Sequence, residues 1–252
     1  MAPQHRSLAR GTAAACTTML AVAGLTAVSA QQDPNNVEDL PPQEIAEKAM
    51  DTTKGADSLR IKGSGRSDQD KIRIDLAVDK QGECTGTLGI NGGTLRLIKI
   101  EDITYVNGDD AFWTRTAEEE GVDAQELINL IDGRWLKVPP GAYGAGDAAE
   151  LCDIDALVQA FETYVSDGVS KGGETEVDGK PAITLTKEED GTTTNTYVAT
   201  EDEPYILRVV TEGGDEPGDL TLTDYDKPVS ATAPSSEDVV DGEELEQLGG
   251  AS

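Results

Sequence analysis

The chain has 252 residues, with 49 Asp and Glu against 20 Lys and Arg and one histidine, His5, for a formal net charge of −29. This charge repels phosphate backbones and no Lys/Arg cluster compensates for it, which argues against nucleic acid as a partner. With a single histidine, chemistry that needs an imidazole is confined to the first ten residues.

Residues 1–30 have the pattern of a secretory signal peptide. A basic segment precedes an uncharged run, and Val28-Ser29-Ala30 suits signal cleavage near Ala30–Gln31. The run is short for a membrane-spanning helix, and an uncleaved N-terminal anchor is the alternative interpretation. Cleavage would leave 18 bases against 49 acids, a net charge of −31, and no histidine. We therefore expect a protein that is secreted into the extracellular cell envelope.

Residues 31–43 are polar and contain prolines, which indicates a linker before a domain at 44–229. The first predicted helix, Pro42–Thr53, begins with a proline, which is common at helix N-termini. Its apolar side chains form one stripe: Ile45, Ala46, Ala49 and Met50.

The dominant pattern of the domain has a period of two. In Lys71–Asp79, apolar side chains alternate with mostly charged ones, which predicts a half-buried antiparallel strand. Turn signals such as Asn91-Gly92 and Asp178-Gly179 separate such segments and indicate successive hairpins. Weaker alternation recurs in four other segments: Leu59–Lys62, Ile183–Thr186, Tyr205–Val210 and Leu220–Thr223.

Two further segments have a helical period. Asp123–Ile131 begins with an N-cap aspartate and has Glu126 three residues later, and Asp153–Val165 ends before Gly168. Each has one apolar stripe: Leu127, Leu130 and Ile131 in the first, and Ile154, Leu157, Val158, Phe161 and Tyr164 in the second. Helices that are separate from a long antiparallel sheet predict the α+β class.

Two segments are predicted to lack regular structure. Gly141-x-x-Gly144-x-Gly146 lacks the ending of a phosphate-binding loop and is interpreted as a flexible loop. Residues 230–252 contain six acids and no Lys, Arg or aromatic residue, which predicts an acidic disordered tail.

The cysteines agree with export. Cys16 lies in the signal segment, so Cys84 and Cys152 remain as a pair in an oxidising compartment. We expect a disulfide between them, with two separate buried thiols as the alternative.

The residue inventory argues against an enzyme. Beyond residue 30 the lack of histidine excludes a Ser-His-Asp triad and an HExxH zinc site. A two-carboxylate glycosidase stays formally open, but 49 acids always supply a pair, so finding one carries no information. No catalytic residue, metal or cofactor is expected, and a divergent hydrolase is the remaining enzymatic hypothesis.

The order of the motifs resembles a known family. ADSLRIKGSG, an alternating charged strand, GECTGTL, ITYVNG with AFW, GRWLKVP and LTDYDKPVSATAP follow one another between Glu44 and Pro234. This order is similar to the LppX/LprA/LprF/LprG-type envelope lipoproteins of actinobacteria. The resemblance implies a half-barrel similar to LolA and LolB, a curved antiparallel sheet whose concave face is covered by helices. It also implies an apolar cavity for the acyl chains of lipids or lipoglycans. One position departs from the family: Gln31 stands where the lipobox cysteine would be, so lipidation there is impossible.

Apolar residues of the strands and helices are the candidates for a lipid-binding cavity. Trp113 and Trp135 are interpreted as rim residues and Tyr105 as a headgroup contact. The full candidate set is Ile72, Ile74, Leu76, Val78, Leu88, Leu95, Leu97, Tyr105, Trp113, Leu127, Leu130, Ile131, Trp135, Leu157 and Phe161.

The sequence thus predicts a secreted, non-catalytic lipid-binding or lipid-carrier protein. Its expected partners are acyl chains, with a membrane or an envelope transporter as a further partner, and it is expected to be a monomer. The alternative is an envelope interaction or sensor module of the same fold, with a filled core and a protein partner.

Overall fold

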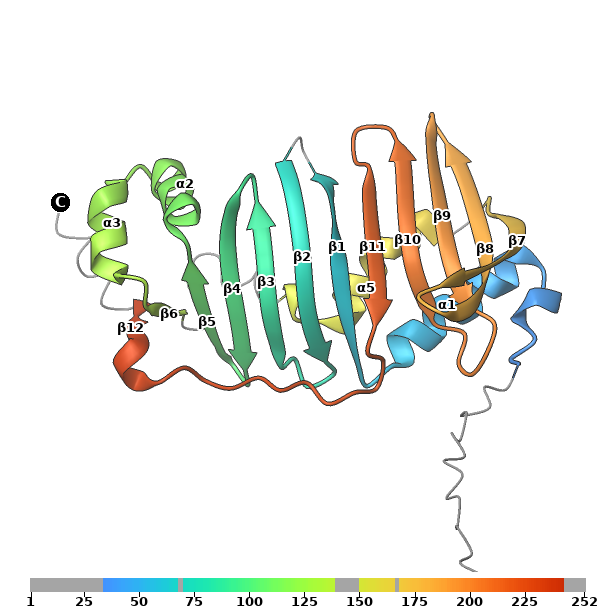
Figure 1. Ribbon diagram of the computed structural model, residues 1–252, viewed down its shortest axis with the longest axis horizontal. Helices are drawn as coiled ribbons and strands as arrows, with labels where there is room; N and C mark the ends of the chain where they lie inside the picture. The colour runs from blue at the N-terminus through green and yellow to red at the C-terminus, as the bar shows by residue number, and fades with distance from the viewer. Residues whose placement is uncertain (1–33, 68–69, 139–149, 166–167, 243–252) are drawn as a thin grey trace, which may run out of the picture. The chain divides into compact units, whose positions relative to one another are not determined.

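A single mixed sheet of twelve strands organises the computed structural model, which describes residues 34–67, 70–138, 150–165 and 168–242 (Figure 1). The strand order is β12-β6-β5-β4-β3-β2-β1-β11-β10-β9-β8-β7. Neighbours are antiparallel except β12 and β6, which pair in parallel. The predicted signal segment, the loop over Gly141–Gly146 and the last ten residues lie outside the described residues.

The strands follow the predicted hairpins along the chain. They are β1 Ser58–Ser67, β2 Asp70–Asp79, β3 Cys84–Ile90, β4 Gly93–Ile100, β5 Ile103–Gly108, β6 Trp135–Val138, β7 Ser170–Val177, β8 Lys180–Glu189, β9 Thr192–Ala199, β10 Ile206–Gly213, β11 Gly218–Thr223 and β12 Val239–Asp241. The helices of the described residues are α1 Pro42–Gly55, α2 Asp110–Glu120, α3 Ala124–Ile131 and α5 Ile154–Val165, with short 3-10 turns at Val37–Asp39 and Ser236–Asp238.

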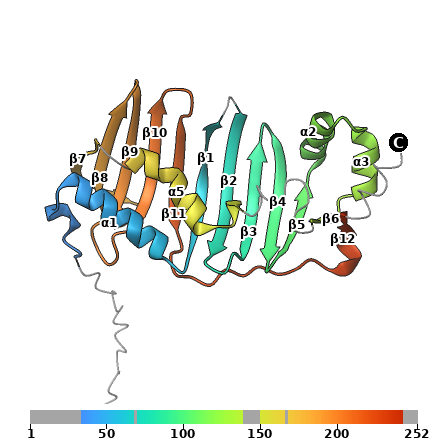
Figure 2. The ribbon, with the colours of Figure 1, turned by 180° about the vertical axis from the view of Figure 1, so that it is seen from behind.

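Helices α1 and α5 pack side by side on one face of the sheet, which is called the helix face below (Figure 2). The stripe predicted for α1 is buried, with Ile45 and Ala49 fully inaccessible. In α5, Val158 and Phe161 are buried in the same core. The α+β class and the helix-covered antiparallel sheet predicted from the sequence are therefore confirmed.

The packed unit extends past residues 44–229 at both ends. Val37, in the predicted linker, is buried in the main core. After β11 the chain runs past the ends of the strands to the opposite end of the sheet, where β12 pairs with β6 (Figure 1). The structure therefore differs from the predicted disordered tail over Val239–Asp241, because pairing with β6 orders a segment that is too short to show alternation in the sequence.

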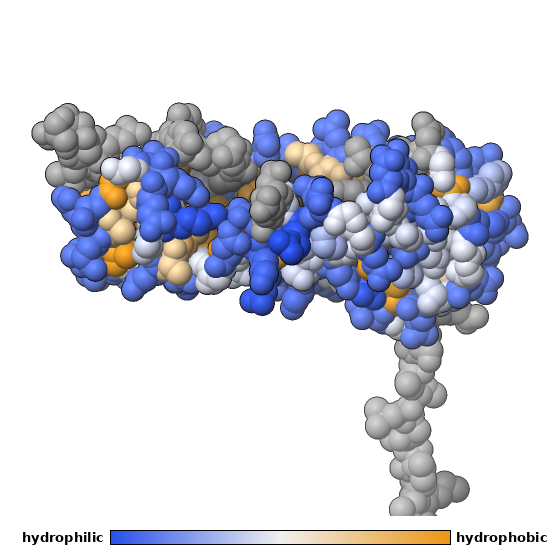
Figure 3. Space-filling model, turned by 90° about the horizontal axis from the view of Figure 1, so that it is seen from above, coloured by the Kyte–Doolittle hydropathy of each residue, from blue (hydrophilic) through white to orange (hydrophobic). Residues whose placement is uncertain are grey.

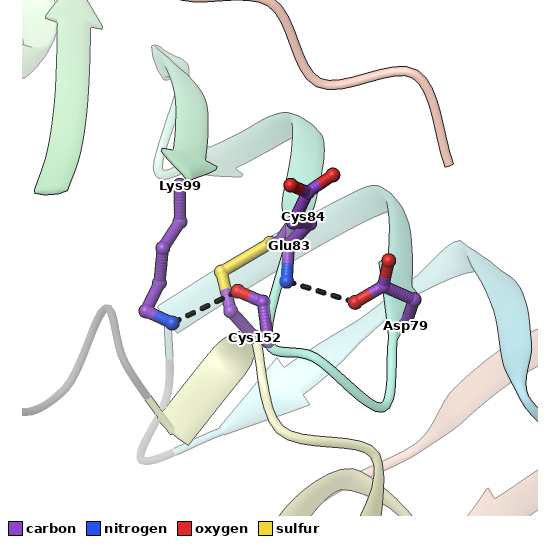
Figure 4. Close-up of a disulfide and its surroundings, with 6 residues drawn as sticks. Asp79, Glu83, Cys84, Lys99 and Cys152 are labelled. Atoms are coloured by element: carbon purple, nitrogen blue, oxygen red, sulfur yellow. Dashed lines mark hydrogen bonds between the residues drawn. A yellow bond between two sulfur atoms is a disulfide. The ribbon is translucent and has the colours of Figure 1, made fainter. Parts of the chain in front are cut away.

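The disulfide between Cys84 and Cys152 is present, as predicted (Figure 4). It joins the start of β3 to the residues before α5, and both cysteines are buried. Close by, Lys99 Nζ donates to the carbonyl oxygen of Gly82 at 2.8 Å, and the backbone N–H of Glu83 donates to Asp79 at 2.9 Å. The cross-link thus fixes one end of α5 to the middle of the sheet.

Helix α2 is not predicted by its sequence, and its start is fixed by one carboxylate. Asp109 accepts hydrogen bonds from the backbone N–H of Phe112 at 2.8 Å and of Thr94 at 2.9 Å. The carboxylate therefore caps α2 and ties it to β4. Burial alone would raise the pKa of Asp109, but these hydrogen bonds outweigh it and hold the pKa below its ordinary value of 3.8.

We expect removal of the disulfide to destabilise the domain. The double variant C84A/C152A should lose about 4 kcal/mol of unfolding free energy, since the bond closes a long loop in the unfolded chain. Urea unfolding of the oxidised protein and of the variant measures this loss. Dithiothreitol should lower the midpoint of the wild-type protein and leave that of the variant unchanged; equal midpoints for oxidised protein and variant would contradict the prediction.

We expect Asp109→Ala to cost about 1 kcal/mol of unfolding free energy at pH 7, since the cap of α2 is lost. The folded pKa lies below the unfolded one, so this stabilisation is present above the unfolded pKa and is lost as the pH falls through the folded value. Urea midpoints of both proteins between pH 7 and pH 2 should therefore converge at the acid end. A difference that is constant over this range would show that the carboxylate charge has no part in it.

Candidate functional site

The helix face carries an unbroken apolar row across eight strands. Side chains of directly paired residues lie on the same face of a sheet, so the strand register identifies the row. It consists of Leu222, Ile61, Leu76, Gly86, Leu97, Val106, Leu136 and Val240. A second row beside it consists of Val209, Leu220, Gly63, Ile74, Leu88, Leu95 and Gly108.

The cover of this face is uneven. The ribbons of α1 and α5 cross β7–β11, β1 and β2, whereas β3–β6 lie clear of both (Figure 2). Beneath the helices the side chains are buried, as Ile61 and Leu222 illustrate. On β2 to β6 a group of apolar side chains on the same face is only half-buried, and we call this group the open half: Ile72, Ile74, Leu95, Val106 and Leu136. Contiguous, partly exposed apolar surface of this kind is characteristic of binding sites.

Most of the predicted strand residues lie on the helix face. Leu76, Val78, Leu88 and Leu97 are buried in the main core, together with Phe161 of α5. Ile74, Leu95 and Leu157 are half-buried and pack against that core. Ile72 shares their face at the end of β2. The structure therefore brings these nine candidates together on the helix face, in the core beneath α5 and in the adjoining open half.

The three candidates on α3 lie elsewhere. Helix α3 packs on α2, beyond β4 and β5, at the end of the sheet opposite to α1 (Figure 1). Ile131 is buried there, while Leu127 and Leu130 are half-buried. Figure 3 shows apolar side chains gathered at this end of the sheet. These residues therefore adjoin the end of the sheet and do not cover its middle.

Tyr105 and Trp135 lie on the opposite, polar face. Tyr105 pairs with Lys137, whose side chain shares a face with that of Trp135 two residues away. The guanidinium of Arg96 lies 5.0 Å from the centre of the Trp135 ring. Arg96 also donates to Asn107 Oδ1 at 2.7 Å. The structure thus separates both aromatic residues from the apolar rows.

Trp113 lies on the helix face, and a glycine makes room for it. The indole is only 5% exposed. A Cβ at Gly108 would come within 3.0 Å of Trp113 Nε1 and 2.4 Å of Phe112, so this position needs glycine. Gly108 pairs with Leu95 of the open half. The role of Gly108 in seating α2 was missed from the sequence, where Asn107-Gly108 reads as a turn.

The polar face is held by solvated ion pairs. Arg208 donates to Asp219 at 2.7 Å, and this bond holds the pKa of Asp219 below its ordinary value. Arg60 lies 2.6 Å from Asp75 in a similar pair. Within the described ranges no group of three or more His, Cys, Asp or Glu side chains is arranged to hold a metal ion.

The motif Asp224–Val229, which contributed to the family resemblance, has a structural role. Tyr225 stacks on Tyr205 with ring centres 3.9 Å apart and donates to the carbonyl oxygen of Ile206. Burial raises the pKa of Tyr225, so the hydroxyl stays a hydrogen-bond donor. Asp226 accepts from the Tyr205 hydroxyl at 2.6 Å and from the backbone N–H of Asp57 at 2.7 Å. The motif therefore fastens the chain after β11 to the start of β1.

Among the residues that the structure describes, no helix is both long enough and apolar enough to span a bilayer. No protein-family model and no curated protein matches the sequence.

Solved structures do match the fold. LprF from Mycobacterium bovis aligns with a TM-score of 0.55 at 13% sequence identity, over 77% of this chain and 97% of that one. Lipoprotein LppX from Mycobacterium tuberculosis aligns with a TM-score of 0.45 at 11% identity, over 76% and 98% of the two chains. The alignment with LprF confirms at the level of the fold the resemblance predicted from the sequence, and this chain has the open half-barrel fold of LprF.

Proposed function

We propose that this protein is a secreted, non-catalytic lipid carrier that holds acyl chains on the open half of its helix face. The observation that carries the proposal is the uneven cover of that face. Beneath α1 and α5, residues such as Ile61 and Leu222 are buried in the core. The apolar rows continue onto β4–β6, where Leu95, Val106 and Leu136 are half-buried.

The energetics favour an acyl chain as the occupant. Each methylene that leaves water for an apolar surface contributes about 0.8 kcal/mol, so a chain that covers several strands is held by desolvation alone. Strands β2 to β6 extend over about 19 Å at the usual interstrand spacing, comparable to the length of a long acyl chain. Binding is therefore passive and needs no charged contact, which suits a chain of net charge −29.

A location outside the cytoplasm agrees with this function. The signal-like pattern of residues 1–30 and the buried disulfide both suit an oxidising envelope. LppX is a lipoprotein, whereas this chain has Gln31 at the lipobox position. Glutamine cannot be lipidated there, so the protein is released after signal cleavage. Such a carrier works as a monomer that exchanges lipid with a membrane or an envelope transporter.

We expect Val106→Gln to reduce the amount of lipid that co-purifies with the protein, by about ten-fold. An amide on the open half has no hydrogen-bond partner once an acyl chain covers it. Extraction of the purified protein followed by mass spectrometry, with a denatured sample as the blank, measures bound lipid per chain.

The matched control is Tyr105→Gln, one residue earlier in β5 but on the polar face, which should retain the wild-type lipid content. Equal losses in both variants would point to destabilisation of β5. Wild-type protein that carries no lipid above the blank and takes none up from vesicles would refute the carrier function and favour an interaction module.

A further inference from the structure

One polar atom on the helix face has no partner. Trp113 Nε1 is buried and makes no hydrogen bond with any described residue. Tryptophan nitrogens that are buried in proteins usually donate to an acceptor, because an unpaired donor loses its hydration without compensation. Arg115 Nε on the same helix also lacks a hydrogen bond, but it lies 3.8 Å from Glu119, and Arg115 Nη1 lies 3.8 Å from Asp70. Glu38 Oε2, near the N-terminus, is the other buried atom without a hydrogen bond among the described residues, so the indole N–H is the unpaired donor that lies beside the open half.

The indole lies at the end of the open half. Its Nε1 is beside Gly108, the last residue of β5, which pairs with Leu95. Leu95 pairs in turn with Leu88, and Leu88 with Ile74, so the second apolar row leads directly to the indole. An acyl chain laid along this row would therefore end beside Trp113.

We propose that Trp113 Nε1 donates a hydrogen bond to the acyl carbonyl oxygen of the bound lipid, at the junction of chain and headgroup. This inference rests on the proposed function. It identifies the ester carbonyl as the part of the lipid that the protein recognises through a polar contact. An acyl ester places a neutral acceptor at the end of its apolar chain, which matches a buried donor at the end of an apolar row. The donor then gains the partner that the described residues do not supply.

The surroundings favour a neutral acceptor. Asp109 and Asp110 lie at the N-terminus of α2, and Asp70 and Glu119 flank Arg115. These carboxylates repel a phosphate or a free carboxylate held against the indole. An ester carbonyl carries no charge and avoids this repulsion.

The test compares two lipids that differ in this carbonyl. Dipalmitoylglycerol and its dihexadecyl ether analogue, neither of which carries a phosphate, are offered together in equal amounts to the full chain, and the lipids bound are extracted and quantified by mass spectrometry. Wild-type protein should prefer the ester by about three- to ten-fold, the range for one hydrogen bond. Trp113→Phe keeps an aromatic ring but removes the N–H, and its ester-to-ether ratio should fall to about one while it still binds the ether lipid.

Trp135→Phe is the matched control, since it makes the same change on the polar face and should keep the wild-type ratio. A wild-type ratio near one, or a Trp113→Phe ratio equal to that of the wild type, overturns the role of Trp113 while leaving the carrier function in place. Failure of the wild-type protein to bind either lipid overturns both proposals. Binding of the ether lipid by Trp113→Phe shows at the same time that the variant is folded.

Discussion

The structure depends on the burial of one apolar face of the sheet, which helices α1 and α5 cover only in part. Nine of the twelve strands present two apolar rows on that face, and α1 with α5 crosses only part of them. The hydrophobic effect stabilises the covered part as a core. The open half keeps apolar surface in contact with water, which is unfavourable. The disulfide holds this division in place, because Cys152 anchors one end of α5 to β3 and so fixes where the cover stops. Core and candidate site are thus two parts of one surface, separated by the position of a helix.

Much of this arrangement follows from local sequence patterns, in which the spacing of apolar residues identifies a strand or a helix and its buried face. The strict alternation in β2 identifies its apolar face, and the stripes of α1, α3 and α5 identify three of the four helices of the described residues. Asp123 caps α3 as its motif predicts, with the Glu126 N–H donating to it at 2.8 Å. Each of these elements has a periodic pattern that is long enough to predict its secondary structure without information from the rest of the chain.

Other features could not be predicted because their causes are not local. Helix α2 has few apolar residues, and it forms because Asp109 bonds to β4 and because glycine leaves space for Trp113. In β5, Ile103 on one face and Val106 on the other are both apolar, so alternation gives no sign that Tyr105 lies on the polar face. Strand β12 has three residues and exists only by pairing with β6. In each case a partner distant in sequence decides the outcome.

The position of β12 has a consequence for the order in which the chain folds. Strands β1 to β6 form a consecutive meander whose two outer strands, β1 and β6, each need a neighbour. Those neighbours are β11 and β12, which come from the last segments of the chain to be synthesised. Until they arrive, the meander has two unpaired edges that can recruit strands from other molecules. A chain that is exported before it folds avoids this hazard, because all its strands are then available at once.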